Sequence, residues 1–180
     1  MVNKSKPKGN ILLIIPLRYF LLFLISICAY SSTLFYNLLF IFTIYPLNFI
    51  LNIFLNSSLE NNLIIIGNKI IEIIPACVAV SAYVFLFILN ISTPMSIKTR
   101  IKSLSFAFFS LLLVNILRLA ILSYLFISGY SAFDVVHKFT WYFLSIILVI
   151  VIWFSSVKLF KIKNIPVYTD INALLNQNTK

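Results

Sequence analysis

The sequence predicts an all-α integral membrane protein, a bundle of about four to five transmembrane helices with a short outer-face loop or hairpin. Of its 180 residues, 62% are hydrophobic and only 10% are charged, about half the charged fraction of an ordinary soluble domain. Several apolar stretches are long enough for the roughly 20-residue helix that crosses a bilayer. Basic segments separate these stretches. The length predicts a single membrane domain, residues 1–180, with polar tails at 1–10 and 158–180.

The net charge of +10 arises from 14 basic and 4 acidic residues. The basic residues do not gather on one soluble face, so nucleic-acid binding is excluded as the explanation. They cluster at residues 4–8, 98–102 and 158–163, and by the positive-inside rule all three segments are expected to be cytoplasmic. Both termini are then cytoplasmic, and the loop around Glu60 lies outside the cell membrane.

The first apolar region, residues 11–55, is too long for one span and awkward for two. Pro46 is expected to break or kink a helix there. Asn48, Asn52 and Asn56 recur at every fourth position and so line one helical face. Two interpretations stay open: a polar stripe inside the bundle, or a helix lying in the membrane interface, which we favour because an odd number of crossings must precede Glu60. A fifth embedded segment at residues 37–54 is the alternative to four spans.

The rest of the chain divides more simply. An isoleucine-rich stretch, residues 63–74, is interrupted by Gly67-Asn68 and predicts a hairpin. Three spans are expected after it, at residues 76–91, 103–127 and 139–157.

Three reactive side chains are expected near the outer face. Cys77 lies in the first turn of its span, which Pro75 opens. Arg118 lies nine residues before Ile127, about 13 Å along a helix. His137 just precedes the last span. Because the three come from different helices, sequence adjacency does not explain their shared location.

Each of these residues has an ordinary explanation as well. A cysteine in an apolar run is usually a buried filler, which we accept for Cys28. For Cys77 that explanation is weaker, because a helix N-terminus and a nearby cation both favour the thiolate. An ionisable group as deep as Arg118 indicates a functional site. His137 gains interest only because Cys77 could face it.

Two neighbouring polar residues have expected supporting roles. Asn115 could hydrogen-bond Arg118, and Asp134, three residues before His137, could orient its ring. A thiol, an imidazole and a guanidinium together suit acyl transfer through a thioester. Two Cys and one His lie far apart in the sequence, so we predict no metal site and no cofactor.

These motifs resemble the exosortase/archaeosortase family, and the chain resembles its compact members. The resemblance rests on residues 75–83, on Asn115-Ile116-Leu117-Arg118 and on residues 134–137, and it covers about residues 64–153. Many members read Cys-Ser-Gly at the nucleophile, whereas this chain reads Cys77-Val78-Ala79.

The resemblance implies a membrane cysteine peptidase or transpeptidase. Cys77 would be the nucleophile, Arg118 the stabiliser of the thiolate or oxyanion, and His137 the acid and base. The implied partners are exported proteins with a C-terminal motif, a hydrophobic span and a basic cluster, cleaved on the extracytoplasmic face, with a membrane lipid as one acyl acceptor. The alternatives are a non-enzymatic membrane scaffold, in which Arg118 pairs with a partner's carboxylate, and a small transporter subunit.

Overall fold

Four helices in the computed structural model are long and apolar enough to cross a membrane, which confirms the predicted fold class. The structure describes residues 20–24, 27–28 and 31–162. Within that part, the four candidate spans are Thr33–Leu55, Pro75–Ser92, Ile97–Ile127 and Phe133–Leu159. Only 22% to 39% of their apolar windows is buried inside the protein, so most of the apolar surface faces outward, as contact with lipid requires.

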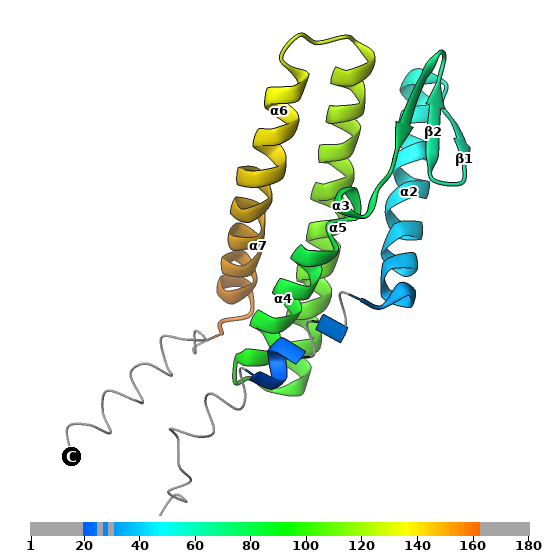
Figure 1. Cartoon of the computed structure of the whole chain (residues 1–180). Coiled ribbons are helices and arrows are strands. Elements are labelled where there is room, and N and C mark those ends of the chain that lie inside the picture. Colours follow the sequence, from blue (N-terminus) through cyan, green and yellow to red (C-terminus); the bar gives the residue numbers. More distant parts are fainter. Residues whose placement is uncertain (1–19, 25–26, 29–30, 163–180) are drawn as a thin grey trace, which may run out of the picture.

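The elements follow one another as helices interrupted by a small sheet (Figure 1). Their bounds are α2 Thr33–Leu55, β1 Ser58–Glu60, β2 Leu63–Ile66, β3 Lys69–Glu72, α3 Pro75–Val78, α4 Val80–Ser92, α5 Ile97–Ile127, α6 Phe133–Phe139, the π-helical turn η1 Thr140–Leu144, and α7 Ser145–Leu159.

Helix α5 is the centre of the bundle and packs against α2, α4 and α7. A buried residue recurs at every fourth position of α5, which places one stripe of side chains against its neighbours. Several members of the stripe are small, and small residues let membrane helices approach closely. The stripe consists of Ser103, Ala107, Leu111, Asn115, Leu119 and Ser123.

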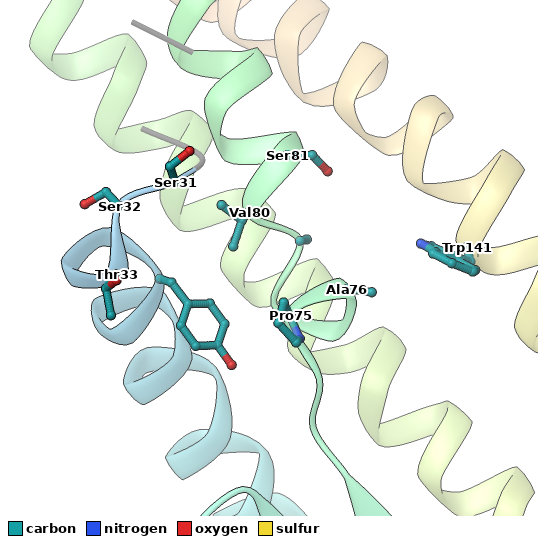
Figure 2. A pocket seen from close by; sticks show the side chains of 10 residues that line it. Ser31, Ser32, Thr33, Pro75, Ala76, Val80, Ser81 and Trp141 are labelled. Atoms are coloured by element: carbon teal, nitrogen blue, oxygen red, sulfur yellow. The ribbon is translucent and has the colours of Figure 1, made fainter. Parts of the chain in front are cut away.

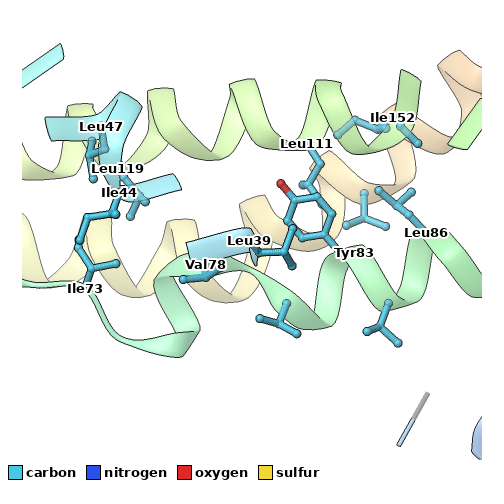
Figure 3. Packing of buried hydrophobic residues seen from close by; sticks show 14 of the residues in the cluster. Leu39, Ile44, Leu47, Ile73, Val78, Tyr83, Leu86, Leu111, Leu119 and Ile152 are labelled. Atoms are coloured by element: carbon cyan, nitrogen blue, oxygen red, sulfur yellow. The ribbon is translucent and has the colours of Figure 1, made fainter. Parts of the chain in front are cut away.

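The apolar core lies between this stripe, α2 and α4. Tyr83 of α4 is only 1% exposed and meets Phe108 edge-on, with ring centroids 5.2 Å apart. Leu47 of α2 and Leu86 of α4 are fully buried in the same cluster (Figure 3). Val78 of α3 is also fully buried, so the core holds the short α3 turn in place.

The predicted hairpin is present and carries a third strand. β1, β2 and β3 form an antiparallel sheet in that order. Gly67, with a φ of 57°, forms the tight β2–β3 turn with Asn68, a conformation that glycine adopts without steric strain. Lys69 Nζ donates to the carbonyls of Phe126 and Ile127 at 3.1 and 2.9 Å, which fastens β3 to the C-terminal end of α5.

The prediction of an interfacial helix around Asn48 to Asn56 is wrong. Asn48 and Asn52 belong to α2, a helix of 23 residues that contains Pro46 and packs beside α5, and Asn56 is its C-cap. Proline inside a membrane helix is tolerated because its neighbours compensate for the lost backbone hydrogen bond. The segment left open as a fifth embedded one is therefore the first described span. The predicted first span begins in residues 11–19, outside the described residues.

The other spans differ from expectation at their ends. α5 begins at Ile97, so Lys98, Arg100 and Lys102 lie on the helix rather than in a loop. The last helical segment begins at Phe133 instead of residue 139 and includes the π-helical turn η1. The span predicted for residues 76–91 is interrupted at Ala79, whose φ of 59° separates α3 from α4.

Candidate functional site

Cys77 lies on α3, a single helical turn with its own fixed ends. Pro75 occupies the first position of the turn, where a missing N–H is harmless. The Cys77 N–H donates to the Ile74 carbonyl at 2.9 Å. Ala79 then turns the chain through a left-handed conformation before α4 begins. The thiol-bearing residue is half-buried, so it is held by its backbone and still reaches a cavity.

Asn115 of α5 holds the same turn from the side. Its Nδ2 donates to the Cys77 carbonyl at 2.8 Å, and its side chain is buried. The sequence suggested Arg118 as the partner of Asn115, and the structure shows the Cys77 main chain instead. One side chain on the buried stripe of α5 therefore sets the position of the thiol-bearing turn.

This contact also places Cys77 deeper than the sequence predicts. Asn115 precedes the end of α5 at Ile127 by 12 residues, about 18 Å along a helix. Figure 1 shows α3 near the middle of α5, with the sheet and α6 flanking the remaining length. Helix α4 is much shorter than α5 and covers only part of its length. The α3 turn, which is separated from α4 at Ala79, therefore lies beside the middle of α5.

Cys77 and His137 line the same cavity, of about 230 Å³. Its walls come from β3, α3, α5 and α6, and His137 lies on α6. The imidazole stacks on Phe133 with ring centroids 5.5 Å apart. The lining residues are Ile70, Ile71, Glu72, Ile73, Cys77, Leu119, Leu122, Ser123, Phe126, Phe133 and His137.

Arg118 lies close by but faces a different wall. It is near enough to Cys77 to interact electrostatically, yet its Nη1 donates to Ser145 Oγ at 2.8 Å. It lines a separate cavity of about 200 Å³ between α5 and the α6–α7 segment. Its buried Nε has no hydrogen-bond partner. Thus Cys77 and His137 line one cavity, whereas the Arg118 side chain lines another and can act on Cys77 only through its charge.

The Arg118 contact falls at the π-helical turn. Ser145 begins α7, and its hydroxyl donates to the Thr140 carbonyl at 3.1 Å, across the widened turn. Such turns are frequent at functional sites. The turn gives the guanidinium an oxygen partner inside an otherwise apolar wall.

The carboxylate that lines the cavity belongs to Glu72, which the sequence did not indicate. The structure shows no hydrogen bond or ion pair between Asp134 and His137, both in its described part. Glu72 lines the cavity with His137 instead, and Asn62 Nδ2 donates to Glu72 Oε1 at 3.1 Å. Ser123 lines the cavity as well. The fourfold spacing along α5 could have indicated Ser123; nothing local indicated Glu72.

A second cavity, of about 480 Å³, lies on the other side of the Cys77 turn. Ser31, Ser32 and Ser81 give it hydroxyl groups, and Trp141 closes one side (Figure 2). Pro75 and Ala76 of α3 line it too. The Cys77 turn therefore stands between two cavities.

The cysteines and the acidic residues offer no metal site in the described part of the chain. No three His, Cys, Asp or Glu side chains cluster there as metal binding requires. Cys28 is exposed, and both thiols are free. The Cys77 cavity contains a thiol, an imidazole and a carboxylate, from Cys77, His137 and Glu72.

Known proteins provide no relative from which a function could be transferred. The chain matches no protein-family model, no curated protein and no solved structure.

Proposed function

We propose that the protein is a membrane-embedded cysteine transpeptidase or protease that cleaves the C-terminal sorting signal of exported proteins through a thioester at Cys77. The observation that carries this proposal is the shared cavity of Cys77 and His137, which lie 60 positions apart in the sequence. A nucleophile beside a base is the arrangement that covalent acyl transfer needs. The resemblance to the exosortase/archaeosortase family supports the same chemistry.

In this mechanism His137 accepts the thiol proton as Cys77 Sγ attacks the scissile carbonyl carbon. The resulting tetrahedral oxyanion collapses, the C–N bond breaks, and the leaving amine takes the proton from His137. The acyl group remains on Sγ as a thioester. Water, or a hydroxyl or amine of a lipid, then attacks the thioester and gives its proton to His137. The C–S bond breaks, and His137 returns the proton to the departing thiolate of Cys77.

Arg118 acts in this scheme through its charge. Its positive charge stabilises the negative charge that develops on the thiol sulfur and on the carbonyl oxygen during the reaction. Ser145 anchors one nitrogen of the guanidinium, which leaves the charge oriented without neutralising it.

The distribution of charge supports cleavage on the extracytoplasmic face. Two basic segments, at the start of α5 and the end of α7, lie at the same end of the bundle, where Phe106 and Phe160 pack with ring centroids 5.9 Å apart. By the positive-inside rule this end is cytoplasmic. The cavity of Cys77 and His137 is lined by β3, by α6 and by the half of α5 that is farther from this basic end. A substrate span with its basic cluster inside would run alongside the bundle in the matching direction.

A scaffold or transporter subunit is the second candidate, favoured by one observation. The buried, unpaired Nε of Arg118 would bind a carboxylate on a partner's helix. A scaffold or transporter subunit does not use the thiol, so its function should be unchanged in the Cys77→Ser variant.

The test is processing of a co-expressed exported protein that carries a C-terminal motif, span and basic cluster. Wild type is compared with Cys77→Ser, Arg118→Ala and His137→Ala, and Cys28→Ser is the matched thiol control. Loss of cleavage in the first three variants, with Cys28→Ser active and all proteins inserted in the membrane, supports the proposal. The mass of the product's C-terminus separates hydrolysis from lipid attachment. Unchanged processing by Cys77→Ser would show that the protein is not a cysteine transpeptidase or protease and would favour the scaffold function.

A further inference from the structure

β3 is an edge strand whose outer side has unpaired main-chain groups. In the order β1-β2-β3, its only neighbour in the sheet is β2. The Ile73 N–H donates to the Asn62 carbonyl at 2.9 Å, which extends the β2–β3 register by one pair. Antiparallel strands alternate hydrogen-bonded and non-hydrogen-bonded pairs. Therefore Lys69, Ile71 and Ile73 bond toward β2, whereas the N–H and C=O of Ile70 and Glu72 point away from it.

This free edge borders the cavity that holds the thiol. Ile70 and Glu72 line that cavity together with Cys77 and His137. Figure 1 shows the third strand between β2 and α5, leading down into α3. Lys69 fixes the start of the strand to the end of α5. The edge is thus held at its upper end and leads to the nucleophile, which follows Glu72 by five residues.

We propose that the free edge of β3 binds the substrate as an extended peptide strand, whose main chain pairs with Ile70 and Glu72 and whose scissile carbonyl then lies at Cys77. This inference rests on the proposed function and names the surface that positions its substrate. Edge strands are templates for strand addition, in which main-chain hydrogen bonds supply affinity and side-chain pockets supply specificity.

The occupant is a peptide because of the chemistry of the edge. The outward groups of Ile70 and Glu72 alternate donor and acceptor at strand spacing, and another extended backbone matches that pattern. A lipid acyl chain offers neither donors nor acceptors. Most of the residues that line this cavity are apolar, and an unpaired backbone group is costly in apolar surroundings, so pairing with a peptide gains more there than in water.

The direction of the bound strand follows from the fold. β3 runs from the end of α5 toward α3, and the proposed substrate enters from the same end before continuing as a helix along the bundle. Its extended segment therefore runs parallel to β3. Along that segment, one residue contacts the exposed Ile70 side chain, and the residue two positions later lies beside the Glu72 carboxylate.

The conformation of the substrate is tested by disulfide cross-linking. The probe is an exported protein whose processing is abolished by Cys77→Ser. Ile70→Cys, in a chain that also carries Cys28→Ser and Cys77→Ser, is paired with single cysteines at successive positions before the probe's span. An extended strand gives cross-links at alternate positions, because its side chains alternate in direction. Cross-links spaced by three or four positions, or none, would overturn the proposal.

The role of the main chain is tested by Ile70→Pro against Ile70→Val. Proline removes the outward N–H of Ile70, which makes no bond to β2, so the sheet tolerates it at an edge. Valine keeps the N–H. We expect kcat/KM to be about tenfold or more lower in the proline variant than in the valine variant, near the effect of one main-chain hydrogen bond, because only the proline variant lacks the N–H.

Two controls separate failure of this inference from failure of the proposed function. Alkylation of Cys77 by iodoacetamide should be equal in Ile70→Pro and wild type, which shows that the thiol site is intact. If Ile70→Pro is intact and processes the probe normally, the strand proposal is wrong while the enzyme stands. If the proline variant does not fold, the cross-linking pattern decides alone. If Cys77→Ser still processes every exported protein that is tried as a substrate, the proposed enzyme function is wrong, and the strand proposal is wrong with it.

Discussion

Asn115 donates a 2.8 Å hydrogen bond from Nδ2 to the main-chain carbonyl of Cys77. The two residues are 38 positions apart, and the bond joins the buried stripe of α5 to the short turn that carries the thiol. Without this donor the half-buried Cys77 carbonyl would lack a hydrogen-bond partner, which lowers the stability of the fold. The bond therefore contributes both to stability and to the position of the thiol-bearing residue.

Asn115→Leu should therefore loosen the α3 turn. We expect a loss of about 1–2 kcal/mol in the free energy of unfolding, because the half-buried Cys77 carbonyl loses its donor. Unfolding of the purified protein in micelles with increasing SDS measures it. The matched control is Asn52→Leu at an exposed position of α2, expected within about 0.5 kcal/mol of wild type. Equal effects of the two changes would contradict this role for Asn115.

Ala79 has a left-handed backbone, with a φ of 59°. A side chain in this conformation costs roughly 1–2 kcal/mol. We expect Ala79→Gly to raise the free energy of unfolding by about 1 kcal/mol, since glycine removes that strain. Ala82→Gly, inside α4, is the control and should lower it by about 0.5–1 kcal/mol. A loss of stability in both variants would show that Ala79 is unstrained.

A chain of buried hydrogen bonds joins three helices at the basic end of the bundle. Asn90 Nδ2 donates to Ser103 Oγ at 2.8 Å, and the hydroxyls of Ser103 and Ser156 lie 2.7 Å apart. Ser103→Ala removes the shared member and leaves both others without that partner. We expect a loss of about 1–2 kcal/mol in the free energy of unfolding in SDS titration.

The control for the Ser103 variant is Ser105→Ala, on the exposed side of the same helix. It changes the same atoms without touching the chain of hydrogen bonds. A wild-type unfolding midpoint in both variants would mean that the chain contributes nothing measurable.

The charge of Arg118 should set the reactivity of the thiol. In a Cys28→Ser background, Arg118→Gln should slow alkylation of Cys77 by iodoacetamide on the order of tenfold at fixed pH, because the cation favours the reactive thiolate. Lys102→Gln, at the basic end of α5, removes an equal charge far from the site and should leave the rate unchanged. If both variants react at the wild-type rate, the electrostatic role of Arg118 is wrong.

Local sequence patterns determined which segments are helices and which residues carry reactive groups. Hydropathy over about twenty residues indicates a span whatever its neighbours are, and Gly67-Asn68 between isoleucine-rich strands indicates a turn by local geometry alone. The same kind of reasoning failed at Pro46, because tolerance of a proline depends on the helices packed around it. It also failed at Ala79, since no local rule requires a left-handed alanine.

The tertiary structure alone decided how these parts meet. The pairing of Asn115 with the Cys77 carbonyl, the depth of the thiol, and the cavity shared with His137 depend on the register between α3, α5 and α6, which interhelical packing sets. Glu72 rather than Asp134 lines that cavity because the sheet docks on the end of α5 through Lys69. The sequence by itself determined a membrane bundle with a thiol, an imidazole and a guanidinium; packing between distant segments decided which of them share a wall.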